Sequence, residues 1–220
     1  HVRGAVNIPL IAIGARGVIS VVANIAPRLV KTMVQAALDG KMEEARKILK
    51  KLYPEVPLII GGIEASLRRV THYDYWSDKL MPSILADSGA DLLFYGMGEK
   101  SLTEFVKLAE RGVDIRKLTN IPQTAFLTDQ GNSYATLANW EELELASHEA
   151  CLADKKTYAR NFRHIEEESN KLEARKLVQR IGNRQVVINP PWPPLTEKEM
   201  DRIYALPFSR QGFKGADGDQ

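Results

Sequence analysis

Hydrophobic and polar positions along the chain alternate between short apolar runs and segments with apolar residues at helical spacing. Apolar runs suited to buried strands occupy residues 18–23 (VISVVA), 57–60 (PLII), 91–95 (DLLFY), 123–128 (QTAFLT) and 185–188 (QVVI). Helical spacing occupies residues 28–38, 42–52, 63–70, 80–88 and 100–110. Strand-like and helix-like segments that follow each other in this way predict an α/β fold.

Successive strand and helix segments of this size predict parallel strands joined by right-handed crossovers. We therefore expect a doubly wound parallel sheet in a Rossmann-like domain over residues 1–138. From Trp140 onward Glu, Lys, Arg and Ala dominate at helical spacing, which predicts a mainly helical region over residues 139–208.

The end of this second region has three distinct parts. The segment NPPWPP (189–194) predicts a stiff extended strap, because its prolines fix the backbone and remove hydrogen-bond donors. Thr196 and Glu199 then form the capping box of a helix. Residues 209–220 are polar and rich in glycine, and we expect them to be disordered.

The composition indicates a globular protein without a membrane anchor. Of the 220 residues, 44% are hydrophobic and 26% are charged, which suffices to bury a core. The longest apolar run, residues 17–26, is far shorter than the roughly 20 residues of a spanning helix. The formal net charge is +2 and its charges are dispersed, so there is no clear nucleic-acid signal. The chain begins at His1 without a signal peptide pattern, and we expect it to be a piece of a longer protein.

A single cysteine limits the chemistry that the chain can carry. Cys151 cannot form an internal disulfide, and by itself it cannot hold a zinc ion or an iron–sulfur cluster. Its isolation fits a reducing, cytoplasmic location. We identify no complete set of nucleophile, base and oxyanion donors, so no catalytic residue and no metal ligand is assigned.

Two glycine-rich loops follow two of the predicted strands. In an open parallel sheet, ligands bind beyond the carboxyl ends of the strands. Glycines let the backbone approach a ligand closely, and the helix starts behind them present free N–H groups to an anion. Glycines that only form tight turns are the alternative. The predicted cofactor-binding residues of these loops are Gly61, Gly62, Glu64, Gly96, Gly98 and Glu99.

Aromatic and titratable side chains are concentrated at residues 72–78 (HYDYWSD). Their order fits neither helical nor strand spacing, so one buried face cannot hide all of them. Segments of this composition usually dock on another surface, although a lid, a ligand wall and core burial are alternatives. His72 could act as an acid or base, but a structural role is the more common one. The predicted docking surface consists of His72, Tyr73, Asp74, Tyr75, Trp76 and Asp78.

Three longer strings carry a family resemblance. They are PLIIGGIEASLRRVTHYDYWSD, ILADSGADLLFYGMGEKSLTEF and VVINPPWPPLTEKEMDRIYALPF. Together they resemble the region that precedes the catalytic core of YgiQ-type radical SAM proteins, over about residues 49–208. The two glycine loops also resemble those of cobalamin-binding-like domains, which share the doubly wound, flavodoxin-like fold. The resemblance implies a downstream radical SAM core as the intramolecular partner, with a 4Fe–4S cluster and S-adenosylmethionine in the full-length protein.

The chain departs from these families at the residues that bind cofactors. A radical SAM core holds its cluster with three cysteines in a CxxxCxxC motif, which this chain lacks, so we expect no cofactor within the chain itself. Cobalamin-binding members ligate cobalt through an Asp-x-His-x-x-Gly string, and only His1 to Gly4 echoes it, without the Asp. Cobalamin binding is therefore not supported.

The amino-terminal residues resemble other families. Residues 10–48 are similar to the last strand and following helices of dihydrodipicolinate synthase-type aldolases, and residues 1–9 (HVRGAVNIP) to a stretch of rhodanese domains. Neither stretch includes the catalytic Lys and Tyr or the active-site Cys of those families. The sequence thus suggests a composite chain, in which one strand-helix piece substitutes for another.

Three classes of function follow from these patterns. The first is an accessory domain of a radical SAM enzyme, which is not catalytic by itself. The alternative is a non-catalytic α/β module that binds a small ligand or has a structural role. Aldolase chemistry from residues 10–48 is the third, and the missing nucleophile argues against it. The sequence names neither the substrate nor the oligomeric state.

Overall fold

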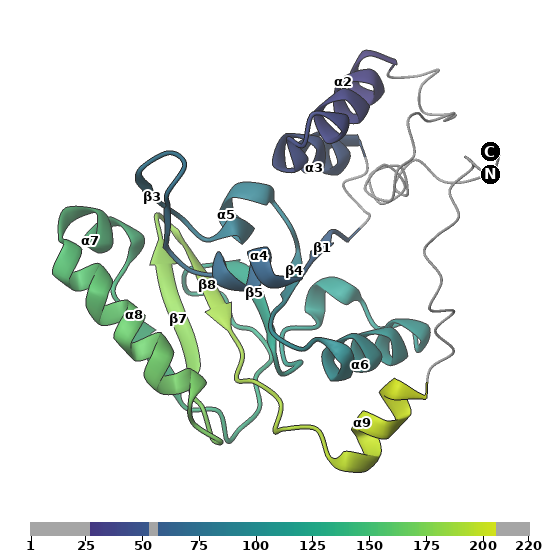
Figure 1. Ribbon diagram of the computed structural model, residues 1–220, viewed down its shortest axis with the longest axis vertical. Helices are drawn as coiled ribbons and strands as arrows, with labels where there is room; N and C mark the ends of the chain where they lie inside the picture. Colours follow the sequence, from purple (N-terminus) through teal and green to yellow (C-terminus); the bar gives the residue numbers. More distant parts are fainter. Residues whose placement is uncertain (1–26, 53–56, 206–220) are drawn as a thin grey trace, which may run out of the picture.

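The computed structural model describes residues 27–52 and 57–205. Its centre is a six-stranded sheet with the order β1-β4-β5-β8-β7-β6 (Figure 1). The strands of this sheet are β1 (Ile59–Ile60), β4 (Leu92–Phe94), β5 (Thr124–Asp129), β6 (Glu142–Leu145), β7 (Lys176–Ile181) and β8 (Arg184–Ile188). A separate hairpin pairs β2 (His72–Asp74) with β3 (Lys79–Met81). Strands from both sides of residue 138 therefore belong to one sheet.

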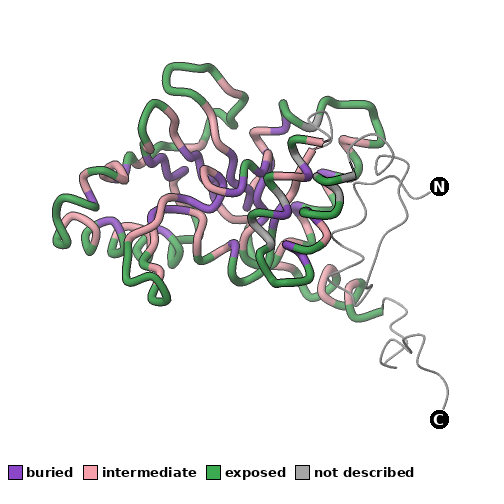
Figure 2. The backbone as a smooth tube through the Cα atoms, turned by 90° about the horizontal axis from the view of Figure 1, so that it is seen from above, coloured by how far each residue is buried: buried purple, intermediate pink, exposed green. Residues whose placement is uncertain are grey.

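The helices cover both faces of this sheet. Along each strand, alternate side chains point to opposite faces. Leu93 and Val186 pack in one buried cluster with residues of α4, α5 and α8, whereas Phe94 and Val187 pack in a second cluster with Phe105 of α6. Buried residues accordingly concentrate in the middle of the molecule (Figure 2). The helical elements are α2 (Pro27–Leu38), α3 (Met42–Leu52), α4 (Ile63–Leu67), α5 (Ile84–Ser88), α6 (Glu99–Glu110), η3 (Ile115–Lys117, a 3-10 turn), α7 (His148–Ala153), α8 (Lys155–Ser169) and α9 (Glu197–Tyr204).

The mixed α/β class is confirmed, but the prediction of an all-parallel sheet is wrong. Among the strand pairs described in this sheet, β1·β4 and β6·β7 are parallel, whereas β4·β5, β5·β8 and β7·β8 are antiparallel. After α6, residues 111–123 return to the carboxyl end of β4, so that Thr124 at the start of β5 pairs with Phe94. Hydrophobic periodicity identifies a strand but not its direction. The doubly wound, flavodoxin-like arrangement is therefore not confirmed.

The region after Trp140 holds α7, α8 and α9, and besides the predicted β8 it contributes two unpredicted strands, β6 and β7, to the sheet. In β7 the sequence pattern is obscured because two polar side chains are buried. Gln179 is hydrogen-bonded on both sides of its amide, and Lys176 forms an ion pair with Glu142 at 3.1 Å. Buried polar residues break the apolar run that normally marks a central strand. The helix predicted at 80–88 is likewise shorter, since residues 79–81 form β3.

Local capping signals were more reliable than element lengths. The capping box of α9 is confirmed, because Thr196 Oγ1 accepts the N–H of Glu199 and the Glu199 carboxylate accepts the N–H of Thr196. At α5, Ser83 accepts the N–H of Leu85, and Gly89 ends the helix with a φ of 67°. A glycine reaches this left-handed conformation without the penalty that a Cβ would bring.

The first two helices form a hairpin with a hydrophobic cluster of its own. This cluster comprises Met33, Ala36, Ala37, Ala45 and Leu49. A link to the rest of the fold is the ion pair between Lys47 of α3 and Asp87 of α5, at 3.1 Å. The strand predicted at residues 18–23 and the tail at 209–220 lie outside the described residues. No helix within the described ranges has the length and apolar character needed to cross a membrane.

Candidate functional site

Two glycine-rich loops lie side by side at the carboxyl ends of β1 and β4. The first loop comprises residues 61–64, and the second loop, which contains Gly96, comprises residues 96–99. These strands are parallel neighbours, with Ile59 opposite Leu92 and Ile60 opposite Leu93. The backbone N–H of Gly96 donates to Ser66 Oγ at 3.1 Å, which joins the second loop to α4 behind the first. A Cβ at Gly61 would lie 3.3 Å from the carbonyl oxygen of Phe94. The expected juxtaposition of the loops is thus observed, while their binding role stays a prediction.

Gln123 fixes the second loop from the opposite side. Its amide nitrogen donates to the carbonyl oxygens of Tyr95 at 2.8 Å and Met97 at 2.6 Å. Gln123 itself has a φ of 63°, which is unfavourable for a residue with a side chain. A Cβ at Gly96 would lie 2.9 Å from the same amide nitrogen. Glycine at position 96 is therefore required both by its left-handed φ of 63° and by this close approach.

The strap formed by residues 189–194 is bonded to the same loop. The N–H of Gln123 donates to the carbonyl of Pro190 at 2.7 Å, and the hydroxyl of Tyr95 donates to the carbonyl of Asn189 at 2.5 Å. Trp192 is held at its backbone by Gln123 Oε1 at 3.3 Å and at its indole N–H by Ser101 Oγ at 3.0 Å. The strap therefore presents a tryptophan whose ring has a fixed orientation.

A cavity of about 480 Å³ lies between the strap and the second loop. Its volume is in the range of small-molecule sites. Lys100 lies at its edge, 5.9 Å from the centre of the Trp192 ring and paired with Glu199 at 3.0 Å. The N–H of Thr196 and the ammonium of Lys100 both lower the pKa of Glu199, to about 2. The lining of this cavity includes Tyr95, Gly96, Met97, Gln123, Leu172 and Trp192.

The other predicted loop residues occupy helix starts at this edge. Gly62 precedes α4 with a φ of 90°, and Gly98 precedes α6. Glu64 is paired at 2.6 Å with Arg68, the C-cap residue of α4, so its carboxylate has a local partner. Glu99 lies in the first turn of α6, where a negative charge complements the helix dipole. Both carboxylates thus have a structural explanation.

Arg69 is an unusual cation at the same edge of the sheet. Its guanidinium lies 5.0 Å above the ring of Tyr95 and donates to the carbonyl of Ser66, while its buried Nε has no partner in the described structure. Burial lowers the pKa of Arg69, and the nearby Tyr95 and Glu166 oppose that effect. Burial also raises the pKa of the Tyr95 phenol. Tyr95 therefore remains a neutral hydrogen-bond donor at physiological pH.

The predicted docking segment at 72–78 forms β2 and the turn of the β2–β3 hairpin, with the turn at residues 75–78. Two carboxylates hold this turn: Asp74 accepts the hydroxyl of Ser77 at 2.6 Å, and Asp78 accepts the hydroxyl of Tyr73 at 2.7 Å. The second bond raises the pKa of the Tyr73 phenol. The rings of Tyr75 and Trp76 contact each other with centres 4.4 Å apart, and these side chains are 64% and 79% exposed. The tip of the hairpin is thus an exposed aromatic surface on a preorganised turn.

His72 lies at the base of this hairpin in a structural setting. Its Nδ1 is 3.2 Å from the carbonyl oxygen of Val70, and burial lowers its pKa. The adjacent Thr71 bonds to Gln179 through its N–H at 2.8 Å and to His148 through its hydroxyl at 3.0 Å. These bonds tie the hairpin to β7 and α7. Catalysis by His72 is not supported by a neighbouring nucleophile among the described residues.

The family of the chain follows from its similarity to known proteins. Residues 44–218 match the family described as radical SAM N-terminal. The chain belongs to this radical SAM N-terminal family. A second, shorter match covers residues 4–61 and is to the dihydrodipicolinate synthetase family. This radical SAM N-terminal chain therefore carries an amino-terminal stretch that is similar to a different family.

Curated relatives of the radical SAM N-terminal chain are UPF0313 proteins. One from Bacteroides thetaiotaomicron is 50% identical over 175 residues, which cover 74% of this chain and 28% of the relative. One from Porphyromonas gingivalis is 49% identical over 164 residues, which cover 74% and 26%. The chain thus spans about a quarter of the length of these relatives. No solved structure matches it.

The described residues of this radical SAM N-terminal domain do not fit an iron–sulfur cluster. Cys151 is buried, and its sulfur lies 3.2 Å from the amide nitrogen of Asn161. Burial raises the pKa of its thiol, which disfavours the thiolate that a metal would need. No group of three His, Cys, Asp or Glu side chains in the described ranges could hold a metal ion. A cluster and S-adenosylmethionine are implied by the family only for full-length proteins.

Sequence reasoning about this domain missed the residues that join its loops. Gln123 and Arg69 were not singled out, and the strap was assigned no contact with the second glycine loop. No local signal marks Gln123, because its role depends on a left-handed backbone and on partners nearly 70 residues away. The two prolines after Asn189 did offer a clue, since such a rigid segment is well suited to pack along a fixed path.

Proposed function

We propose that this chain is an accessory domain of a radical SAM protein and docks on the downstream catalytic core through its aromatic hairpin. Membership of the radical SAM N-terminal family supports the accessory role. The observation that carries the docking proposal is the exposed Tyr75–Trp76 pair on a turn that the Asp74 and Asp78 carboxylates hold by hydrogen bonds.

The hairpin has the physical properties of a binding hot spot. Tyr and Trp supply a large contact area with few rotatable bonds, and they are enriched at interface centres. The turn is fixed by Asp74 and Asp78, so little conformational entropy would be lost on binding. On α4, Ile63 and Leu67 are exposed as well. An isolated chain gains nothing from exposing these side chains to water.

The proposal can be tested with the remainder of the Bacteroides thetaiotaomicron relative, expressed without its matching region and mixed with this chain. Isothermal titration should detect association. Trp76→Ala should weaken it at least about tenfold, which corresponds to about 1.4 kcal/mol.

The matched control is Phe162→Ala, because Phe162 is also an exposed aromatic residue but lies on α8. It should leave the affinity unchanged. Association that is equally strong with Trp76→Ala, or equally weakened by both variants, would contradict the docking role. If the separated core does not fold, hydrogen exchange of residues 72–81 can be compared between this chain and a full-length chimera that contains it. Equal exchange in both would count against docking.

A second candidate function is small-ligand binding in the cavity between the strap and the Gly96 loop. The cavity of about 480 Å³ and the fixed ring of Trp192 favour it. Gly96→Ala should abolish a ligand-induced rise in melting temperature, because its Cβ would crowd Gln123. Gly112→Ala is the control, since Gly112 has a similarly positive φ and open space around it. A ligand shift that survives Gly96→Ala would place the ligand elsewhere.

A further inference from the structure

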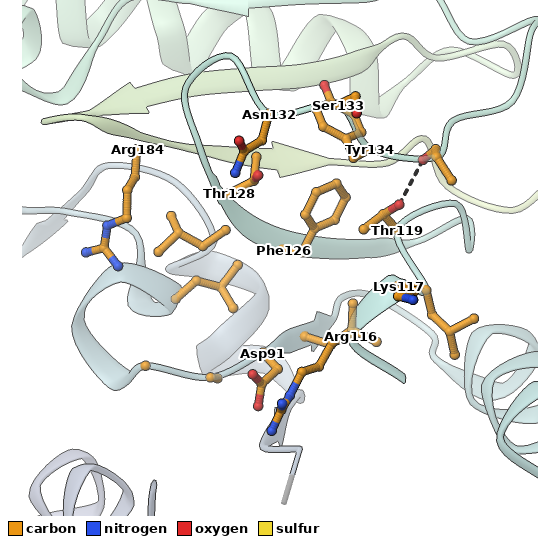
Figure 3. Close-up of a pocket in the computed structure, with 17 residues that line it drawn as sticks. Asp91, Arg116, Lys117, Thr119, Phe126, Thr128, Asn132, Ser133, Tyr134 and Arg184 are labelled. Carbon is orange, nitrogen blue, oxygen red and sulfur yellow. Dashed lines mark hydrogen bonds between the residues drawn. The ribbon is translucent and has the colours of Figure 1, made fainter. Parts of the chain in front are cut away.

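A larger cavity lies beside β5 at the amino end of β4 (Figure 3), whereas the glycine loops follow the carboxyl ends of β1 and β4. It arises from unequal strand lengths. On its β4 side, β5 is paired only at Thr124 and Ala125, whereas on its β8 side it is paired as far as Asp129. The part of β5 beyond Ala125 therefore borders a space of about 710 Å³ instead of a neighbouring strand of the described fold. This volume is within the range of ligand sites.

The rim of this cavity is basic. Arg116 and Lys117 reach it from η3, and Arg184 reaches it from the start of β8. In Figure 3, Arg184 lies at one end of the cavity, and Arg116 lies beside Asp91 at another. Asp91 is the acidic residue of the lining, and its Oδ2 accepts the N–H of Leu58 at 2.7 Å. Lys117 and Arg184 form no ion pair within the described residues, so their charges are available to a ligand.

Further hydrogen-bonding groups lie along the same rim. The side chains of Thr128, Asn132 and Ser133 line the cavity without a hydrogen bond to any other described residue. Thr119 instead donates its hydroxyl to the carbonyl of Ala135 at 2.9 Å, which holds the loop that forms one wall. Unpaired hydroxyl and amide groups next to cations are the donors that recognise phosphate and carboxylate oxygens.

The floor of the cavity is apolar and includes aromatic rings. Phe126 and Tyr134 meet edge to face, with centres 5.3 Å apart and planes at 73°. Lys176 lies 4.8 Å from the centre of the Tyr134 ring and helps to fix it. Leu92 and Leu118 pack in the same cluster as Phe126. A flat ring could contact this floor while a charged group reached the rim.

We propose that this cavity binds a small anion that carries a flat ring, such as a phosphorylated or carboxylated aromatic compound of nucleotide size. The apolar floor would take the ring, and Lys117, Arg184 and the unpaired donors would bind the anionic group. This site is independent of the proposed docking function, because none of its lining residues belongs to the hairpin or to the glycine loops.

Isothermal titration of the chain with four probes tests the proposal. Adenosine 5′-monophosphate combines a ring with a phosphate, and indole-3-acetate combines a ring with a carboxylate. Adenosine and inorganic phosphate each supply one part alone. We expect one of the two combined probes to bind more tightly than both single-part probes, and the better of the two identifies the anionic group. Adenosine binding as tightly as its monophosphate, with no binding of indole-3-acetate, would overturn the anionic part. No heat with any probe would overturn the site.

Variants then locate the binding. Arg184→Gln and Lys117→Gln should each weaken the better probe about fivefold, which corresponds to loss of about 1 kcal/mol. Both side chains are at the surface, so the fold should persist, and circular dichroism verifies this. The control is Lys198→Gln, because Lys198 is exposed on α9. Unchanged binding in both cavity variants, or an equal loss in the control, would contradict the assignment.

Discussion

Glu168 is the carboxylate that the described fold buries most completely, with 3% of the residue exposed. It accepts hydrogen bonds from the guanidinium and backbone of Arg175 and from the ammonium of Lys171 at 2.8 Å. Burial alone would raise its pKa, but these donors outweigh burial and lower it to about 2. A buried carboxylate with this many donors holds the end of α8 against the start of β7.

This pKa predicts a defined dependence of stability on pH. The folded-state pKa of Glu168 is below its ordinary value of 4.5, so the stabilisation is present above about pH 4.5 and is lost as the pH falls toward 2. Between pH 6 and pH 3 the loss from this group should be about 2 kcal/mol. In urea unfolding, the free energy of unfolding of Glu168→Gln should fall by about 2 kcal/mol less between pH 6 and pH 3 than that of the native chain. Glu110→Gln, at an exposed position on α6, should retain the dependence of the native chain.

Gln123 provides a second prediction at this scale. Replacement by Ala removes the bonds to Tyr95 and Met97 but keeps a side chain in the left-handed conformation. We expect the free energy of unfolding to fall by about 2–3 kcal/mol. Gln123→Gly loses the same bonds, but glycine adopts the left-handed φ without strain. It should therefore be about 1 kcal/mol more stable than Gln123→Ala. Equal stability of the two variants in urea would show that the φ of 63° carries no cost.

At the scale of elements, the hairpin gives a prediction about Trp76. Because this side chain is 79% exposed, Trp76→Ala should lower the free energy of unfolding by less than about 1 kcal/mol. Phe126→Ala, in the middle of β5, should cost about 3–5 kcal/mol, since Phe126 is buried. Thermal and urea unfolding of both variants make the comparison. A loss for Trp76→Ala as large as that for Phe126→Ala would mean that the hairpin packs as core.

The elements differ in how far the sequence could predict them. The apolar runs of β1, β4, β5 and β8 and the amphipathic α2, α3 and α6 were identified, because their burial follows directly from periodicity. β7 was missed, since Lys176 and Gln179 are buried polar residues with partners on other elements. β6 was missed as well, although its Glu and Leu residues alternate at strand spacing. The hairpin was assigned as an irregular segment because its two strands have only three residues each. The antiparallel direction of β5 relative to β4 depends on the path of residues 111–123, and their sequence does not indicate that path.

The candidate sites also differ in whether the sequence could predict them. The position of both glycine loops could be predicted, because neighbouring parallel strands end at the same edge. The Gln123 clamp and the bonding of the strap could not, since they join residues far apart in sequence. The basic cavity also left no sequence signal, because its rim combines residues from η3, β5 and β8 that share no motif.

At the scale of the whole molecule, the α2–α3 hairpin has a separate core from the sheet. We therefore predict that it opens at a lower free energy than the sheet. In native-state hydrogen exchange, amides of Met33 and Leu49 should exchange with a lower opening free energy than those of Val186 and Val187 in β8. Equal values across these four residues would instead indicate one cooperative unit that includes the hairpin.

The sequence separation within the strap contacts has a consequence for synthesis on the ribosome. Tyr95 and Asn189 are 94 positions apart, and Ser101 and Trp192 are 91 apart. At roughly 5–20 residues per second, the Gly96 loop waits roughly 5–20 s for the strap to be translated. During that interval the Tyr95 hydroxyl lacks its acceptor on the strap, and the end of β4 is open to chaperones and proteases. A pause in translation just before the strap would lengthen this vulnerable period.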